Sequence, residues 1–285
     1  MREPLTEARA HEILTDRANI VSLDVIRKKA PSVFSETASA RTSEKYHFIP
    51  TVSVLEIMRS QGWQPVYVSE QTVRTEARKG FQRHVLRFRN FERDFTINGS
   101  TVEMVLVNSH DGLSSYQIHA GVFRLVCSNG LVVADSLFDT LRVRHQGNMD
   151  KDFIDVSYKV IHDVPKIAEE VRSFGQVVLN RDEQEAFAKS ALTLRWDRDQ
   201  NETVPIVPDQ LLRTRRMADQ PSDLYTTFNT IQENLVRGGL AGRNRTGRRT
   251  RTREVKGINE NIRLNKSLWQ LAQEMKRIKT TGGLE

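Results

Sequence analysis

Apolar and polar residues alternate with a period of two through the middle third of the chain, from Gln64 to His145. The apolar positions are mostly β-branched or aromatic, and turn residues separate the runs, which is typical of short β-strands. Asn98-Gly99 and Asn129-Gly130 favour tight two-residue turns, and strands joined by such turns pair antiparallel. The pattern predicts an antiparallel meander made of PVYVSEQTV, QRHVLRFR, TVEMVLVNSH, SSYQIHAGVFRLVC, GLVVAD and TLRVRH.

Helical periodicity flanks this meander on both sides. Before it, Val52, Leu55 and Met58 share one face of a predicted helix that follows Pro50 and ends at Gly62. After it, the pattern predicts a long helix from Phe153 to Val171, bent at Pro165. Further helices are predicted in DEQEAFAKSALTLRW, from PDQLLRTRRM onward, along Leu224, Phe228, Ile231 and Leu235, and along Leu264, Leu268, Leu271, Met275 and Ile278. We expect the last stripe to dock on the body of the protein or on another subunit.

A sheet followed by helices defines an α+β fold, here an antiparallel β-meander sheet followed by a long helix and a C-terminal helical region. We divide the chain into an irregular N-terminal arm (1–45), a core of sheet plus helix (46–175), a helical region (176–236), a basic Arg-rich segment (237–256) and a C-terminal amphipathic helix (257–285).

Length and composition indicate a cytoplasmic protein without a membrane segment. The 285 residues contain no apolar run long enough to span a bilayer, and MREPLTEARA at the amino terminus lacks the apolar stretch of a secretory signal. A single cysteine, Cys127, excludes an intramolecular disulfide framework and fits a reducing compartment. Its apolar neighbours favour a buried position in the core.

Positive charge is concentrated in one segment. The chain has 43 Lys and Arg against 36 Asp and Glu, whereas Arg237–Lys256 alone holds eight bases and one acid, which leaves 35 of each sign elsewhere. Such a segment implies a polyanionic partner, most often nucleic acid, although a solvated charge run without a ligand is the alternative. The candidate binding residues are Arg243, Arg245, Arg248, Arg249, Arg251 and Arg253.

A second basic stripe is predicted on the sheet. Arg83, Arg87 and Arg89 share one face of an extended strand and are expected to line a groove that follows a phosphate backbone. Residues expected to extend this stripe are Arg78 and Lys79 in the adjoining turn, and Arg142 and Arg144 in a later strand. The alternative is a solvated sheet face with the arginines paired to Glu92 or Asp94.

Aromatic rings beside a basic track can stack on the bases of a single strand. Phe81, Phe91 and Tyr116, with Trp63, are the candidates, and each can equally be a core residue. Few aromatic residues lie within the Arg-rich segment, which favours contact with the backbone there over readout of bases.

The sequence gives little support to an enzyme. It contains no CxxC, HExxH, GxxxxGK[ST] or GxSxG motif. His110-Asp111, His119 and His145 are the residues from which a metal or nucleophile site would have to be built, but HDG is better explained as a turn. We therefore expect no catalytic residue, no metal and no cofactor.

Several segments resemble one family when taken in order: YHFIPT, NSHDGLSSYQIHAGVFRLVCSNGLVV, RHQGN, DLYTTFNTIQENLVRGG and RRTRTREVKGINENIRLNKSLWQLAQEM. They are similar to domain-of-unknown-function family 932 of phage- and plasmid-borne proteins, from about Tyr46 to Met275. The family name carries no activity. The resemblance implies a mobile element, where single-stranded DNA and host defences are encountered. The topology of the meander and helix also resembles the core of single-strand annealing proteins of the Redβ and Rad type.

These observations lead to three hypotheses. The first is a sequence-independent single-stranded DNA-binding protein of a mobile element that acts as an annealing or protecting homo-oligomer, with a duplex intermediate as a further ligand. The second is a protein-directed antagonist of host restriction or defence, in which the basic segment binds an acidic protein surface. The third is a metal-dependent nuclease that uses His110 and Asp111.

Overall fold

The computed structural model describes residues 7–44, 46–97, 99–114, 116–124, 132–133, 141–143, 162, 166–196 and 204–282. Several predictions fall outside these ranges. They concern Asn98, the turn at Asn129-Gly130, Cys127, Arg144, His145 and, in the helix expected from Phe153 to Val171, nearly all of the part before Lys166.

The predicted antiparallel sheet is confirmed. Four long strands pair in the order β1 (Trp63–Glu70), β2 (His84–Asn90), β4 (Ser100–Asn108) and β5 (Tyr116–Arg124). Short strand β3 (Thr96–Ile97) pairs with β4, and β6 (Val132–Val133) and β7 (Leu141–Val143) both pair with β5. Ile97 lies opposite Ser100, and Gly99 has a φ of 66°, which agrees with the tight turn that the sequence predicts between these strands.

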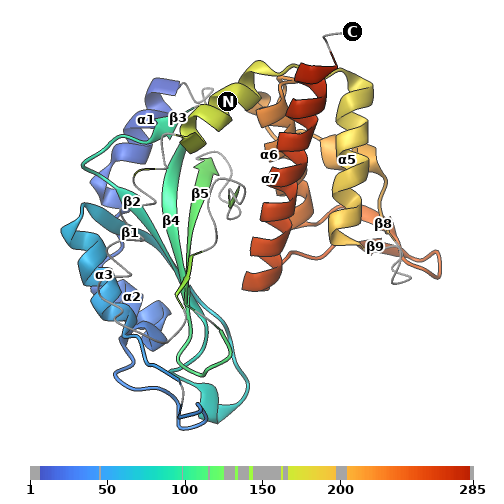
Figure 1. The fold of residues 1–285 in the computed structure, drawn as a ribbon. Coiled ribbons are helices and arrows are strands. Elements are labelled where there is room, and N and C mark those ends of the chain that lie inside the picture. Colours follow the sequence, from blue (N-terminus) through green and yellow to red (C-terminus); the bar gives the residue numbers. More distant parts are fainter. Residues whose placement is uncertain are drawn as a thin grey trace.

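Helices lie on both sides of the sheet (Figure 1). On one side are α2 (Leu23–Lys29) and α3 (Thr51–Ser60), and on the other are α6 (Leu224–Arg237) and α7 (Ile258–Thr281), with α5 (Arg181–Arg195) beyond them. Alternate residues of β4 therefore contribute to two apolar clusters. Met104 and Leu106 belong to the large core that contains Leu55 of α3, whereas Val105 packs in a smaller cluster with Ile262 of α7.

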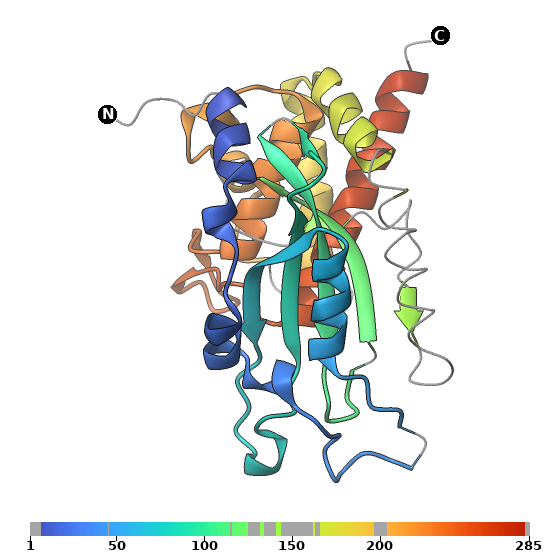
Figure 2. The same cartoon turned by 90° about the vertical axis from the view of Figure 1, so that its left-hand side faces the viewer.

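The N-terminal arm is not irregular as we expected, because it contains α1 (Glu7–Thr15) and α2. Both helices run along one side of the sheet (Figure 2). The Ser22 hydroxyl caps α2, and Ile26 is fully buried in the large core. With only seven residues, α2 is too short to give a recognisable helical period.

Of the helices predicted in the C-terminal half, all but one are present in the described residues. The helices predicted in DEQEAFAKSALTLRW, on the Leu224 stripe and on the Leu264 stripe are α5, α6 and α7, and residues 166–176 are helical. The segment PDQLLRTRRM instead forms 3₁₀ turns, η4 (Pro208–Leu212) and η5 (Met217–Asp219). The Asn234 side-chain amide donates to the backbone oxygens of Leu211 and Arg213, both at 2.9 Å, so these carbonyls bond to α6 and not to a turn of their own helix. None of the described helices is both long and apolar enough to cross a membrane.

Candidate nucleic-acid interface

The Arg-rich segment folds into a β-hairpin at the end of the helical layer (Figure 1). Strands β8 (Ala241–Arg243) and β9 (Arg249–Arg251) pair antiparallel, with Arg243 opposite Arg249 and Ala241 opposite Arg251. The pairing continues beyond the strands, because the Gly239 N–H donates to the Thr252 oxygen at 2.8 Å and the Thr252 N–H donates to the Leu240 oxygen at 2.9 Å. We call residues 239–253 the arginine hairpin.

Asn244 holds the loop of the arginine hairpin. Its side-chain oxygen accepts hydrogen bonds from the N–H groups of Thr246 and Arg248, at 3.0 and 2.9 Å, and from the Thr246 hydroxyl at 2.8 Å. Gly247 has a φ of 75°, which glycine adopts without strain. Asparagine and glycine therefore give the loop a defined conformation although four arginines lie between residues 243 and 249.

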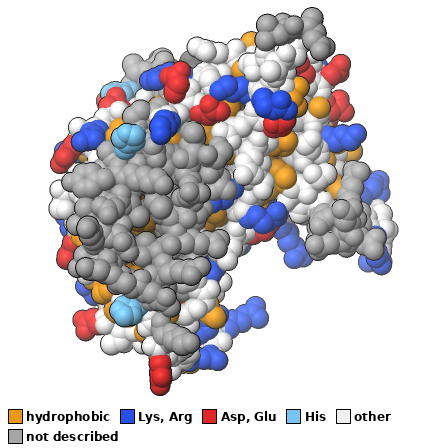
Figure 3. Space-filling model, viewed as in Figure 1, with side chains coloured by type: hydrophobic (Ala, Val, Ile, Leu, Met, Phe, Trp, Pro, Cys, Tyr) orange, Lys and Arg blue, Asp and Glu red, His pale blue; other side chains and the backbone are white. Residues whose placement is uncertain are grey.

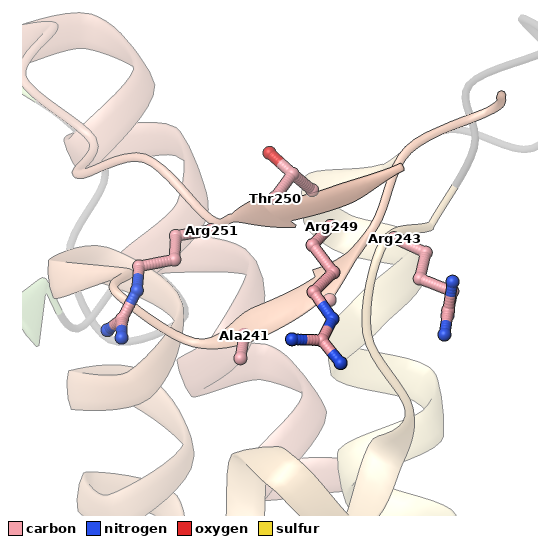
Figure 4. A pocket seen from close by; sticks show the side chains of 6 residues that line it. Ala241, Arg243, Arg249, Thr250 and Arg251 are labelled. Atoms are coloured by element: carbon pink, nitrogen blue, oxygen red, sulfur yellow. The ribbon is translucent and has the colours of Figure 1, made fainter. Parts of the chain in front are cut away.

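The arginine hairpin has a closed back and an open front. Because directly opposite residues project to the same side of an antiparallel pair, Ala241, Arg243, Arg249 and Arg251 share the front, while Gly242 and Thr250 face the back. A Cβ atom on Gly242 would come within 2.0 Å of the Pro205 oxygen, so the chain before α6 blocks the back at this point. The front borders a shallow pocket of about 610 Å³ (Figure 4).

The positive charge of the hairpin is not neutralised. All six arginines from Arg243 to Arg253 are exposed, and none of them pairs with a carboxylate in the described part of the chain. Two of these side chains bond to backbone oxygens, from Arg243 Nη1 to Gly247 at 2.8 Å and from Arg251 Nη1 to Gly239 at 3.2 Å. Lys and Arg side chains gather at this end of the molecule (Figure 3). The arrangement can attract and hold an anion.

Two other arginines anchor the base of the hairpin. Arg195 donates to the backbone oxygens of Leu235 and Arg253, and its guanidinium lies 4.8 Å from the centre of the Trp196 ring. Burial lowers the pKa of Arg195. Arg215 donates to the Gly238 oxygen at 3.3 Å. Arg195 thus connects the last residue of the hairpin to α5, and Arg215, from the segment between η4 and η5, binds the residue just before the hairpin.

The arginines of β2 do not form the exposed stripe that we expected. Glu103 of β4 is fully buried and pairs with both Arg87 and Arg89, each at 2.7 Å. Arg89 also donates to the Leu14 oxygen at 2.7 Å, and Arg87 lies 3.6 Å from the centre of the Phe123 ring. The expected alternative partners, Glu92 and Asp94, are not the ones used. Glu103 is the partner because the sheet register places it opposite Arg89.

The remaining residues of the sheet stripe do not extend it as we expected. Arg78, Lys79 and Arg83 lie in the connection between β1 and β2. Arg78 pairs with Asp111 at 2.8 Å, and Lys79 pairs with Glu76 at 2.6 Å. Arg83 Nη2 donates to the Leu113 oxygen at 3.3 Å. Arg142 lies in β7 opposite Gln117, and the structure does not describe its side chain. A role of these residues in binding nucleic acid stays a prediction, and none of the interactions above connects them to the arginine hairpin.

The aromatic candidates divide into buried and half-buried rings. Tyr116 and Trp63 are both fully buried, and burial raises the pKa of the Tyr116 hydroxyl well above its ordinary value. Trp63 stacks on Phe95 with ring centres 5.9 Å apart. These two rings are core residues, which corrects their assignment as stacking platforms. Phe81 and Phe91 are half-buried.

A buried polar cluster, which the sequence did not reveal, joins the N-terminal arm to the sheet. The Ser32 hydroxyl lies 2.5 Å from Glu70 Oε2 and 2.8 Å from His84 Nδ1. His84 Nε2 lies 2.9 Å from the Thr51 hydroxyl, which in turn lies 3.3 Å from His110 Nε2. Burial lowers the pKa of His84 to about 3, so its ring is neutral at physiological pH. Ser32, Thr51 and His84 are 0% exposed, and a substrate would find no surface of theirs to contact.

Asp111, which follows His110 and is the second residue of the nuclease hypothesis, has its carboxylate bound by neighbouring groups of the protein. Burial alone would raise the pKa of its carboxyl group, but hydrogen bonds from the Leu113 N–H, Arg78 and Ser109 outweigh burial and lower the pKa. Within the described residues, no group of three His, Cys, Asp or Glu side chains is placed to hold a metal ion.

Comparison with known proteins identifies relatives of the chain but no activity. A family model described as Domain of unknown function (DUF932) matches residues 39–269, a range that includes the arginine hairpin. UPF0380 protein YfjQ of Escherichia coli (strain K12) is 42% identical over 246 residues, which cover 86% of this chain and 88% of the relative. UPF0380 protein YafZ of the same organism is 41% identical with the same coverage. No solved structure matches.

Proposed function

This chain belongs to the DUF932 family, and we propose that it binds nucleic acid through the arginine hairpin, by contacts with the phosphate backbone and without sequence preference. The observation that carries the proposal is a β-hairpin with six exposed arginines, none of which pairs with a carboxylate among the described residues. Guanidinium groups keep their charge at any accessible pH and form paired hydrogen bonds with phosphate oxygens.

The geometry of the hairpin supports an anionic ligand on energetic grounds. Like charges directly opposite each other weaken the pairing of two strands. Arg243 and Arg249 occupy such positions, and neither has a carboxylate neighbour within the described residues to relieve the repulsion. A bound phosphate backbone would relieve it and release counterions at the same time.

We propose single-stranded DNA of a mobile element as the ligand, and an annealing or protecting oligomer as the assembly. The resemblance of the chain to phage- and plasmid-borne proteins supports this choice of ligand. No aromatic residue lies between residues 237 and 257, a range that includes the hairpin. In this proposal the hairpin therefore contacts the sugar-phosphate backbone of the nucleic acid and does not stack on its bases. No comparison supports a relationship to the Redβ and Rad proteins, and annealing is therefore the part of the proposal with the least support.

An acidic protein surface is the competing partner, since the same arginines could bind carboxylates of a host defence protein. A nuclease has less support, because the Asp111 carboxylate forms an ion pair with Arg78 and the neighbouring His110 is fully buried.

Titration of a fluorescent oligonucleotide with the full chain at two salt concentrations tests the proposal. If the six arginines each neutralise one phosphate of a single strand, affinity should fall by at most about 300-fold between about 50 mM and about 200 mM salt. Binding that is absent at low salt, or that does not change with salt, would contradict the proposal. Capture of an acidic host protein together with absent oligonucleotide binding would favour the competing partner.

A further inference from the structure

The front of the arginine hairpin presents its charges in a definite arrangement. Arg249 and Arg251 are two residues apart on one strand, which places their Cα atoms about 6.8 Å apart. Arg243 lies opposite Arg249, where Cβ atoms are about 5 Å apart. The three guanidinium groups point to the same side and lie in a row, without converging on one point (Figure 4).

A row of separate guanidinium groups suits a row of phosphates better than a single phosphate group. A nucleic-acid strand carries one negative charge per ~3.4 Å of its axis when it is stacked, and the distance grows when it is extended. Neighbouring arginines on the front can therefore contact different phosphates of the same strand. The back of the hairpin cannot contribute, because Pro205 lies against Gly242 there.

Apart from the arginines themselves, the hairpin offers few side chains for contacts with base edges. The side-chain oxygen of Asn244, the one amide side chain of the loop, accepts three hydrogen bonds within the loop and is engaged by them. Thr250 faces away from the arginine row (Figure 4). Residues outside the front, Arg245 and Arg248 in the loop and Lys256 beyond β9, add positive charge without belonging to the row.

We propose that Arg243, Arg249 and Arg251 form a binding site for consecutive phosphates of one continuous nucleic-acid strand, with the bases turned away from the hairpin. The inference rests on the proposed function. It adds that the affinity for nucleic acid depends on where an arginine lies on the hairpin, and not on the total charge alone. It also predicts that a second strand adds little to the affinity, because one row of arginines offers nothing to the second strand of a duplex.

Two triple variants with equal loss of charge test this site. The front variant carries Arg243→Gln, Arg249→Gln and Arg251→Gln, and the control carries Arg245→Gln, Arg248→Gln and Lys256→Gln. For an oligothymidylate, the front variant should lower the slope of log affinity against log salt by about 2, since three phosphate contacts are lost at about 0.7 each, and the control should lower it by less than about 1. Equal losses in the two variants would overturn the site but leave the proposed function standing, whereas wild-type chain that binds no oligonucleotide would contradict the proposed function itself.

Two further arms complete the experiment. A duplex that contains the same strand should bind no more than a few fold more tightly than the single strand. Duplex binding that is ten-fold tighter or more would mean that the second strand is also contacted, and would overturn the proposal of a site for one strand. If the front variant fails to fold by circular dichroism, the triple Arg243→Lys, Arg249→Lys and Arg251→Lys replaces it. Lysine keeps the charge but not the planar fork, so this variant should bind several fold more weakly with an unchanged salt slope, and unchanged affinity would contradict guanidinium–phosphate contacts.

Discussion

Arg243 and Arg249 lie directly opposite each other on the two strands of the arginine hairpin. A pair of like charges at such positions destabilises a hairpin by up to about 1 kcal/mol relative to a neutral pair. The hairpin keeps its shape because Asn244 closes the loop and Arg195 and Arg215 bind the backbone at its base. Contacts in the loop and at the base of the hairpin thus stabilise it, while the arginines on the front between them stay available for an anionic ligand.

Arg249→Glu should separate stability from binding. The new carboxylate would face Arg243 across the strands and replace a repulsion by an attraction, so the hairpin amides of Leu240 and Thr252 should exchange with solvent more slowly. Oligonucleotide affinity should fall at least ten-fold at low salt. Arg245→Glu, in the loop and without a cross-strand partner, is the control and should leave amide exchange unchanged. Faster exchange in Arg249→Glu would contradict the proposed repulsion.

Asn244→Ala should weaken binding without any change in charge. The substitution removes the acceptor of three hydrogen bonds and loosens the loop, so binding must then include the entropic cost of ordering the hairpin. We expect affinity to fall several fold while the salt slope stays the same, because the number of phosphate contacts does not change. Fluorescence anisotropy at several salt concentrations measures both quantities. An unaltered affinity would mean that order in the loop does not matter for binding.

Glu103→Gln should destabilise the fold strongly. The substitution leaves two partly buried guanidinium groups, of Arg87 and Arg89, without their shared carboxylate. Removal of one partner from a buried ion pair typically costs about 3–5 kcal/mol. Glu76→Gln removes the exposed partner of Lys79 and should cost about 0.5 kcal/mol or less. Urea unfolding measures both, and a small effect in Glu103→Gln would show that these arginines are not structural.

The stability of the protein should depend on pH through His84. Its folded pKa of about 3 lies below the ordinary value of about 6.5, so the unfolded chain binds a proton that the folded chain does not. The stabilising effect is complete above about pH 6.5 and is lost as pH falls from there towards 3, by at most about 1.4 kcal/mol per pH unit. His84→Gln should flatten the curve of unfolding free energy between about pH 5 and 6.5, and an identical slope in both proteins would contradict the buried neutral ring.

The sequence predicts the strands and turns better than it predicts which side chains form ion pairs. Alternation and the turn at Gly99 are local signals, and the sheet agrees with them. The pairing of Arg87 and Arg89 with Glu103 depends on strand register, which is not local, but a clue was present: Glu103 is the one charged residue in β4. A glutamate within an apolar strand needs a buried cation, and the arginines of β2 were the candidates nearby.

For the candidate site, the sequence predicts the location of the basic segment but not its hairpin structure. The density of arginines from residue 243 to residue 253 marks the segment in the sequence, and charge counting is enough to find it. Its hairpin register depends on Asn244, on Gly247 and on the close approach of Gly242 to Pro205, and the last of these is a tertiary contact. The buried cluster around His84 was missed because its members come from five separate segments of the sequence.

The affinity of two six-fold variants for an oligothymidylate tests the central claim most directly. One variant replaces the six hairpin arginines by Gln, and the other replaces six exposed bases elsewhere, namely Lys28, Lys29, Arg172, Arg181, Lys189 and Arg277. Both lose the same charge, so a general electrostatic effect would weaken both equally. We predict that the hairpin variant binds at least about 100-fold more weakly at low salt, where several phosphate contacts are lost, while the second variant stays within a few fold of the wild type. Equal weakening of the two, or wild-type affinity in the hairpin variant, would contradict nucleic-acid binding by the arginine hairpin.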